Sequence, residues 1–532
     1  MIIRDFKLNE VEVNDSYLSN AFRMEQDYLL NLEADRLLAG FYEIAGKQPK
    51  AKRYTGGWED QDIAGHTLGH YLIALAQVYA STGNKKFLER LNYVVDSLAE
   101  CQAESGYLSA FREELFDNLE QGKQAWTPWY TMHKILAGLI RVYQLAALPK
   151  ALDVAICLGN WVSNRVNRWD DATKTKVLAT EYGGMNDCLY ELYKESGKIE
   201  FMMAAEKFDE LPLFQEIYND NDILDGRHAN ATIPKFIGAL NRYLTMGEEQ
   251  EFYLDCARKF FDIVLQNHTY VTGGNSEWEH FGTPKILAAE RTNCNCETCN
   301  TYNMLKLARG LFCITGEKKY LDFYEGTFWN SIVSSQNPKT GMSMYFQPMA
   351  TGYFKVFSRP FDNFWCCTGT GMENFTKLND SIYYVKGDTI YFAMYISSRL
   401  KNEELGIDLK LTADLPANPV VNVVVKKVSD GETKLAFRKP EWSKNGFSVT
   451  RKGKNLKTEE RGGFVYISID KGTTGIQVTF LPEVAIHELP DNPNVVAFTY
   501  GHLVLSAGLG KEEMVSSTTG VNATTLELSG SS

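Results

Sequence analysis

Val78-Tyr79-Ala80-Ser81-Thr82-Gly83 is the stretch that decides the fold, because its pattern, the end of an apolar helix followed by a small turn, recurs along the first two thirds of the chain. Similar stretches are Phe41-Tyr42-Glu43-Ile44-Ala45-Gly46, Val142-Tyr143-Gln144-Leu145-Ala146-Ala147, Leu192-Tyr193-Lys194-Glu195-Ser196-Gly197, Arg242-Tyr243-Leu244-Thr245-Met246-Gly247 and Leu311-Phe312-Cys313-Ile314-Thr315-Gly316. The later copies lie roughly 50 to 70 residues apart, the length of a helical hairpin plus a loop. A hairpin cannot bury its apolar face alone, so the repeat predicts stacked hairpins.

Six stacked hairpins can close into a ring. Apolar residues such as Leu72, Leu75 and Val78 recur at helical spacing. The glycines that end most copies suit left-handed helix caps. We therefore predict a mainly α chain, with an (α/α)6 toroid or barrel over residues 16–380 whose inner helix ends and loops line a central pocket.

Beyond residue 380 the pattern changes to a period of two, which is typical of strands. The predicted strands are Ile390–Ile396, Val420–Val425, Gly463–Ile469 and Ile476–Phe480. They predict an all-β sandwich over residues 381–532, with residues 1–15 as an N-terminal strand segment packing on it. His487 and His502 are interpreted as solvated or packed histidines. The end of the chain, from Gly510 to Ser532, is interpreted as a tail or the start of a strand pair.

Composition limits the classes of function. The 532-residue chain is 44% apolar, enough for a large core, and has a formal net charge of -12. The negative charge and the lack of a basic run argue against nucleic acid. No apolar stretch is long enough to span a membrane, and the first residues are not a basic start with an apolar core. We therefore expect a cytoplasmic, bacterial-type protein unless a signal peptide was removed. The oligomeric state is left open, with a homodimer as the candidate assembly.

Six of the ten cysteines lie between residues 294 and 367. Glu297, Cys299, Cys366 and Cys367 offer the carboxylate and thiolate ligands that suit Zn²⁺. We expect Glu297 and Cys299 in an extended segment with side chains on one side, and a capping box, Thr370-Gly371-Met372-Glu373, to start a helix after the cysteine pair. Buried small cysteines, a strained vicinal disulfide and a purely structural zinc are the alternatives.

A Gly-rich loop supplies acids near these cysteines. Gly273-Gly274-Asn275-Ser276-Glu277-Trp278-Glu279-His280-Phe281 holds two carboxyl groups beside aromatic rings, and either is a candidate general acid/base. Burial against the rings would raise the pKa of such a carboxyl toward that of a proton donor. Two solvated surface glutamates are the simpler interpretation.

Aromatic residues and histidines gather before the other inner-type helices. They are Gly57-Trp58-Glu59-Asp60, His66, His70, Trp126-Thr127-Pro128-Trp129-Tyr130, His133, Glu181 to Asp187 and Gly226 to Asn230. Their recurrence at one end of the hairpins predicts a cavity that binds a small carbohydrate. Taken singly, each residue is equally explained by core packing or capping, and His66 with His70 would hold a metal only if a further ligand joined them.

In combination, these motifs resemble the β-L-arabinofuranosidases of glycoside hydrolase family 127 and its relative family 146. The resemblance rests on Glu297-x-Cys299, the Cys366-Cys367 pair, the Gly273 to Phe281 loop, and the hairpins with His133 and His228. It implies an (α/α)6 barrel followed by a β-sandwich. It also implies a Zn²⁺ ion held by Glu297, Cys299, Cys366 and Cys367. Thr368-Gly369-Thr370-Gly371 after the pair favours the family 146 branch.

The resemblance further implies a retaining exo-glycosidase that releases terminal L-arabinofuranose from β-linked plant arabino-oligosaccharides or glycoproteins. Cys366 would be the nucleophile and Glu279 the general acid/base. The implied substrate contacts are His133, His228 and Glu325, and we add Trp58, Tyr345 and His66 as candidate substrate-binding residues. A sugar epimerase or isomerase on the same barrel, and a carbohydrate-binding protein with a structural zinc, remain as alternatives.

Overall fold

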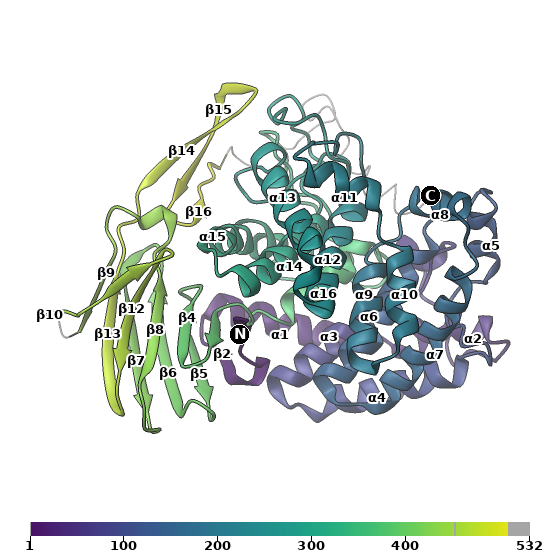
Figure 1. Ribbon diagram of the computed structural model, residues 1–532, viewed down its shortest axis with the longest axis horizontal. Helices are drawn as coiled ribbons and strands as arrows, with labels where there is room; N and C mark the ends of the chain where they lie inside the picture. Colours follow the sequence, from purple (N-terminus) through teal and green to yellow (C-terminus); the bar gives the residue numbers. More distant parts are fainter. Residues whose placement is uncertain (1, 452–453, 509–532) are drawn as a thin grey trace.

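The computed structural model describes residues 2–451 and 454–508, and divides into a helical part and a β part that lie side by side (Figure 1). A ring of six inner helices forms the centre of the helical part. They are α3 (His66–Thr82), α6 (Pro128–Ala146), α9 (Met185–Ser196), α12 (Ala229–Met246), α14 (Thr298–Thr315) and α16 (Cys366–Phe375). Each contacts the next, and α16 contacts α3, so the ring is closed. The predicted (α/α)6 barrel is confirmed.

A second layer of helices surrounds this ring and buries its apolar face against it. The main outer helices are α1 (Ser16–Asn31), α2 (Ala34–Ile44), α4 (Lys85–Cys101), α7 (Pro149–Val166), α10 (Ile199–Lys207), α11 (Leu211–Tyr218), α13 (Glu251–Asn267) and α15 (Lys318–Thr327), with α5 (Glu114–Glu120) and α8 (Asp171–Leu178) in connecting segments. In α4, for example, Phe87, Leu91, Val94 and Leu98 are buried at helical spacing.

The sixth inner helix is not the one that the sequence repeat indicates. Five copies of the repeat end α3, α6, α9, α12 and α14, whereas Phe41 to Gly46 lies at the end of the outer helix α2. The ring is closed by α16, which ends at Thr376 without a glycine. Gly83, Gly197 and Gly316 have φ of 66°, 69° and 70°, as predicted for left-handed caps.

The β part is a sandwich of two main sheets. The strand order is β1-β3-β4-β8-β12-β11 in one sheet and β10-β9-β13-β7-β6-β5-β2 in the other. Their bounds are β1 (Arg4–Asp5), β2 (Val11–Val13), β3 (Tyr383–Lys386), β4 (Thr389–Phe392), β5 (Ser398–Asn402), β6 (Ile407–Asp414), β7 (Asn418–Lys427), β8 (Thr433–Arg438), β9 (Ser448–Arg451), β10 (Lys454–Asn455), β11 (Glu459–Arg461), β12 (Phe464–Ile469) and β13 (Gly472–Thr479). Alternate residues of β7, such as Val421, Val423 and Val425, point into the core.

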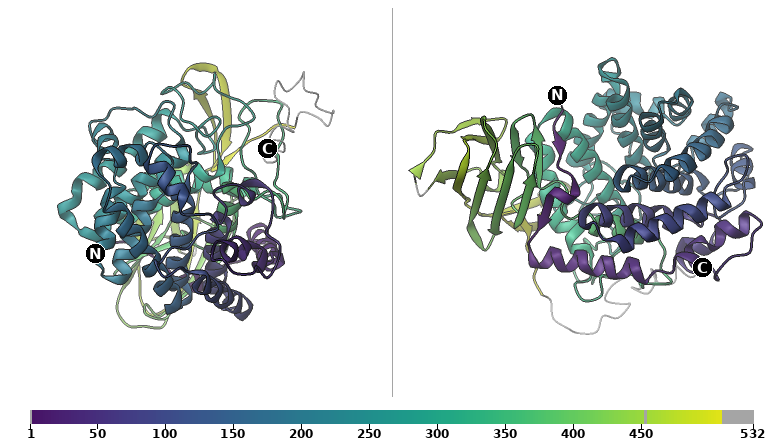
Figure 2. Two further views of the ribbon diagram at one scale, coloured as in Figure 1. Left: turned by 90° about the vertical axis from the view of Figure 1, so that its right-hand side faces the viewer. Right: turned by 90° about the horizontal axis from the view of Figure 1, so that it is seen from below.

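The N-terminal segment adds one strand to each main sheet, because β1 pairs with β3 and β2 pairs with β5. Figure 2 shows this segment, in purple, at the junction between the sheets and the barrel, just before the chain enters α1. One apolar core continues across the junction: Phe312 of α14 contacts Tyr384 of β3 at 4.8 Å between ring centroids. The two parts are therefore packed together.

A third, smaller sheet follows the sandwich. It consists of β14 (Val484–Leu489), β15 (Asn492–Tyr500) and β16 (Leu503–Val504). The β14–β15 hairpin extends beyond the main sheets along the side of the barrel near α13 and α15 (Figure 1). Continuous sandwich was predicted here, but these strands pair only with one another among the described residues. The interpretation of Gly510 to Ser532 lies outside those residues.

Within the described ranges, none of the helices combines the length and apolar character that a membrane crossing requires.

Candidate active site

Loops that precede the inner helices meet at one end of the barrel and enclose a cavity of about 300 Å³. Thr127, His228, Glu297 and Trp365 are the N-cap residues of α6, α12, α14 and α16, and all four line it. The other lining residues are Trp58, Ile63, Trp126, Tyr130, Glu181, Asn230, Trp278, Glu279, Tyr345, Phe346 and Cys366. Helix N-termini carry partial positive charge, so their convergence favours carboxylates and thiolates here.

Glu297, Cys299, Cys366 and Cys367 form a buried cluster on one side of this cavity, with ligand atoms within 4.8 Å of one another. The Sγ atoms of Cys299 and Cys367 are 3.3 Å apart. Cys366 Sγ lies 3.4 Å from Glu297 Oε1 and 4.0 Å from Cys367 Sγ. A tetrahedral ion with bonds of about 2.3 Å holds its donor atoms about 3.8 Å apart. The cluster therefore has the size of a four-coordinate metal site.

The surroundings of the cluster also fit a metal ion. Glu297 Oε2 is buried and has no hydrogen-bond partner among the described residues, so it is free to coordinate. All ten cysteines are free thiols. A disulfide needs sulfurs about 2.05 Å apart, so a vicinal disulfide between Cys366 and Cys367 is contradicted.

The local structure of this cluster differs from the prediction in two ways. Glu297 is the N-cap of α14 and Cys299 lies in its first turn, so the two are not in an extended segment. Helix α16 begins at Cys366, not at the predicted capping box. Thr370 instead contacts Cys299 Sγ at 3.3 Å, and Glu373 contacts His70 Nδ1 at 2.5 Å. These side chains are therefore used for tertiary contacts between neighbouring inner helices.

Cys366 differs from its neighbours in charge. Contacts with the thiols of Cys299 and Cys367, and with the Tyr345 hydroxyl, hold the pKa of Cys366 well below its ordinary value despite burial. Burial raises the pKa of Cys299 and of Cys367 well above the ordinary value. Negative charge in the cluster is thus concentrated on Cys366, the one of these three cysteines that lines the cavity.

Glu279 faces Cys366 across a single hydroxyl group. The Tyr345 hydroxyl donates to Glu279 Oε1 and also lies 3.4 Å from Cys366 Sγ. Ser276, Trp278 and Glu279 have φ of 80°, 43° and 69°. Non-glycine residues rarely adopt such values, and they concentrate at functional sites. This backbone directs Glu279 into the cavity.

The other predicted acid, Glu277, does not line the cavity; it accepts a hydrogen bond of 3.1 Å from Thr292.

His228 lies between two carboxylates. Its Nε2 is 3.3 Å from Glu279 Oε2 and 3.9 Å from Glu181 Oε2. Burial lowers the pKa of His228, but the two carboxylates outweigh this effect and raise it to about 9. Burial raises the pKa of Glu181, and the nearby charges of Glu279 and Cys366 add to the increase. At neutral pH the cavity therefore holds a cationic histidine beside Glu279.

Aromatic rings form the walls of the cavity. Trp58 and Trp126 meet edge to face at 4.8 Å, and Tyr345 lies 4.6 Å from Phe346 and 5.6 Å from Trp365. Trp126 and Trp278 are about two-fifths exposed, which places them at the rim. Such walls suit the C–H faces of a sugar ring, while His228 and the carboxylates are placed to bond hydroxyl groups.

Three residues expected at the substrate lie outside the cavity lining. His66 is fully buried in α3, with Nε2 3.0 Å from the Phe364 carbonyl oxygen. His133 is buried in α6, with its ring against Gly183 and Gly184. Glu325 is on α15, paired with Arg438 at 2.7 Å. In each case a helix interior or an ion pair holds the side chain away from the cavity. His70, bonded to Glu373, does not form a metal pair with His66.

Three lining residues were missed by the sequence reasoning: Ile63, Phe346 and Trp365. Trp365 precedes Cys366, and Phe346 follows Tyr345. For these two, the only available signal was adjacency to a predicted residue. Neighbours in an extended chain point to opposite sides, whereas here Trp365 caps a helix and Phe346 lies in an irregular segment, so both neighbours reach the cavity.

An (α/α)6 barrel whose helix N-termini surround an aromatic cavity, with a carboxyl group close to a cysteine thiol, is compatible with a glycoside hydrolase. Comparison with known proteins identifies the family. Residues 10–380 match the model of the β-L-arabinofuranosidase GH127 catalytic domain, and residues 389–480 match the GH127 middle domain. The chain belongs to glycoside hydrolase family 127.

Known relatives agree with this assignment. The chain is 21% identical over 238 residues to the non-reducing end β-L-arabinofuranosidase of Bifidobacterium longum subsp. longum, a match that spans 42% of this chain and 36% of that protein. A GH127 β-arabinofuranosidase structure superposes with a TM-score of 0.76 at 18% identity, covering 94% of this chain and 85% of the other. The structure of a GH127 β-L-arabinofuranosidase from Geobacillus stearothermophilus gives 0.72 at 16% identity, covering 93% and 86%. These two structures show a shared fold.

Proposed function

We propose that this chain is a retaining exo-glycosidase that releases terminal L-arabinofuranose from β-linked plant arabino-oligosaccharides or glycoproteins, with Cys366 as nucleophile and Glu279 as general acid/base. One observation carries the proposal: the Tyr345 hydroxyl contacts both Cys366 Sγ and Glu279. Two groups joined through one hydroxyl are close together. In retaining glycosidases the two catalytic groups are about 5–5.5 Å apart, compared with about 6.5–9.5 Å in inverting ones.

The reaction proceeds in two displacements. The Cys366 thiolate attacks the anomeric carbon, and the glycosidic C–O bond breaks as Glu279 gives its proton to the leaving oxygen. A thioglycosyl intermediate results. Glu279 then takes a proton from water, whose oxygen attacks the anomeric carbon and returns the electron pair to Cys366. Two inversions give net retention.

A Zn²⁺ ion held by Glu297, Cys299, Cys366 and Cys367 would keep these thiols deprotonated and fix their positions. Cys366 is the thiol that both belongs to this donor set and lines the cavity. A purely structural site would be closed to substrate, so this position supports a catalytic role. The positive charge of His228 faces Glu279 and favours its ionised form, which arises once Glu279 has given its proton to the leaving oxygen.

The cavity supports an exo action on one terminal sugar. Its volume of about 300 Å³ is at the small end of the usual range for ligand sites, roughly 300–1,000 Å³. An epimerase would need two histidines facing the sugar. Among the described residues, His228 is the one histidine that lines this cavity, so the geometry favours the glycosidase.

Hydrolysis of 4-nitrophenyl β-L-arabinofuranoside tests the proposal. Cys366→Ser and Glu279→Gln should each lower kcat by several orders of magnitude, because each removes a group that acts in the transition state. Glu277→Gln is the matched control, since Glu277 lies on the same loop but outside the cavity lining, and it should retain activity. Circular dichroism would establish that all variants fold. Equal activity in the four proteins would refute the mechanism.

A further inference from the structure

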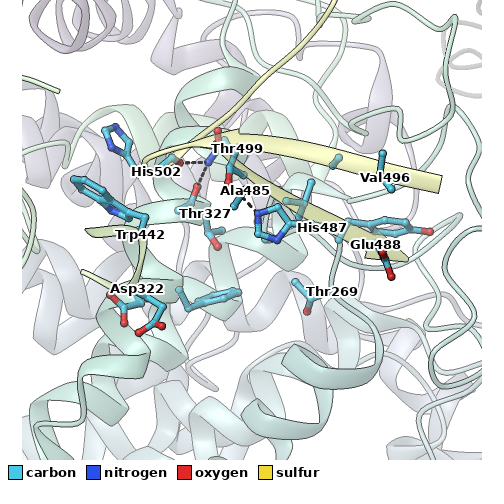
Figure 3. Close-up of a pocket in the computed structure, with 18 of the residues that line it drawn as sticks. Thr269, Asp322, Thr327, Trp442, Ala485, His487, Glu488, Val496, Thr499 and His502 are labelled. Carbon is cyan, nitrogen blue, oxygen red and sulfur yellow. Dashed lines mark hydrogen bonds between the residues drawn. The ribbon is translucent and has the colours of Figure 1, made fainter. Parts of the chain in front are cut away.

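A second and larger cavity, of about 860 Å³, lies between the β14–β15 hairpin and the barrel (Figure 3). Its walls come from the end of α13, the 269–273 segment, α15, the turn around Trp442, and the inner face of the hairpin. It shares none of its lining residues with the catalytic cavity. The proposed reaction therefore leaves it without a role.

Trp442 gives this cavity a fixed aromatic wall. Its indole Nε1 donates a 2.8 Å hydrogen bond to Glu325, which Arg438 pairs at 2.7 Å. Its ring is stacked on Phe480, with centroids 5.2 Å apart and planes at 29°. Held in this way, the ring would lose little conformational entropy when a ligand packs against it. Glu325, expected at the catalytic sugar, instead supports this wall.

Polar groups converge on the same space. In Figure 3, Trp442 and His502 lie at one end, with Asp322 below Trp442, and His487 and Thr499 lie on the hairpin. His487 Nε2 is 2.9 Å from Thr499 Oγ1. His502 is 7% exposed and contributes to the cavity wall beside Trp442.

The charges of the lining favour a neutral ligand over an anionic one. Four carboxylates, Asp322, Glu441, Glu483 and Glu488, face two cations, Arg291 and Lys444. Phosphorylated chains or polyuronates would meet net negative charge. Aromatic and apolar surface together with hydroxyl-bonding groups suits a neutral sugar chain.

The hairpin is attached to the barrel, so the cavity is already formed. Asp491, at the hairpin turn, accepts hydrogen bonds from the backbone N–H groups of Leu287, Ala288 and Ala289 at 3.0, 2.8 and 3.0 Å. Leu489 packs beside Tyr270 and Leu287. These contacts hold the hairpin away from α15 at a fixed separation.

We propose that this cavity is a second carbohydrate-binding site, which takes a neutral oligosaccharide stretch of the substrate chain away from the hydrolysed end. The expectation that this oligosaccharide contains arabinose rests on the proposed function. The binding site itself rests on Trp442, His487 and the charge of the lining.

Calorimetric titration of the intact chain carrying Glu279→Gln, which should bind without turnover, tests this proposal. The probe is a neutral arabino-oligosaccharide, with oligogalacturonate as the anionic control. We expect two binding events per chain for the neutral probe, of which saturating L-arabinose abolishes one. Adding Trp442→Ala should weaken the other by about tenfold or more. A single event that Trp442→Ala leaves unchanged, or equal binding of the anionic probe, would overturn the proposal.

His487→Ala is a second variant with little risk of misfolding, because His487 is exposed on the hairpin. It should also weaken the second event and should leave kcat/KM for the small 4-nitrophenyl glycoside unchanged. Loss of small-glycoside hydrolysis in the Cys366→Ser variant tests the proposed function separately. The two ideas can therefore fail independently.

Discussion

His228 is the residue through which pH should act on the catalytic cavity. Its pKa, about 9, is above the ordinary histidine value because Glu181 and Glu279 flank it. The favourable interaction with Glu279 is therefore fully present below the ordinary pKa, near 6.5, and is lost as the pH rises through about 9. We expect kcat/KM for the small glycoside to fall on an alkaline limb near pH 9.

The variant that tests this assignment is His228→Asn. It should lower kcat/KM by about tenfold or more and remove the alkaline limb from the pH profile. His487→Gln, remote from the catalytic cavity, serves as the control. A pH profile whose alkaline limb is identical in wild type and His228→Asn would assign the limb to another group.

Among the elements, the caps of the inner helices offer a stability test. Ala147 ends α6 with φ of 51°, at the position that glycine takes in α3, α9 and α14. An alanine in the left-handed region is strained by about 1 kcal/mol. Ala147→Gly should therefore raise the free energy of unfolding by up to about that amount. Gly83→Ala should lower it similarly, since nothing lies within 4 Å of the added Cβ and only φ opposes it.

The β14–β15 hairpin contacts the connection between α13 and α14, which also carries Glu279. Asp491 accepts hydrogen bonds from the backbone N–H groups of Leu287, Ala288 and Ala289 in this connection. Asp491→Ala should reduce kcat by about threefold to tenfold through a less ordered Glu279, and stability by about 1 kcal/mol. Asp430→Asn, which breaks an exposed ion pair with Lys471, is the control and should change neither.

The pH dependence of Asp491 follows from the same contacts. Burial raises its pKa, but the bonds from Ala288, Ala289 and Leu287 lower it below the ordinary value. Its contribution to stability is present above the ordinary pKa and is lost as the pH falls through the lowered value. The difference in stability between wild type and Asp491→Ala should therefore shrink in acid.

At the scale of the whole molecule, the metal cluster joins the last two helices of the inner ring. Cys299 is on α14, whereas Cys366 and Cys367 are on α16, the helix that closes the barrel. A bound ion would therefore stabilise ring closure as well as the thiolates. We expect about one zinc per chain by elemental analysis, and chelation should lower both Tm and activity. A metal-free chain of unchanged Tm and activity would contradict this role.

The sequence by itself determined the local and periodic features. Helices ending at Gly83, Gly197 and Gly316, the strands beyond residue 380, and the short motifs Glu297-x-Cys299 and Cys366-Cys367 all follow from short-range patterns of residue type. The grouping of these two motifs into one donor set came from the family resemblance. Their physical basis, such as helical spacing, left-handed caps and thiolate chemistry, acts within a few residues.

Only the tertiary structure decided which distant segments meet. It placed α16 in the inner ring, whereas the helix that ends with the first copy of the repeat, α2, lies in the outer layer. It also placed Tyr345 between Cys366 and Glu279, and it placed Glu325 where it accepts a hydrogen bond from Trp442. It also left His66 and His133 outside the cavity lining. These outcomes depend on side-chain packing between residues tens to hundreds of positions apart. The local periodicity of the sequence does not predict such contacts, because each depends on how the side chains pack in the completed barrel.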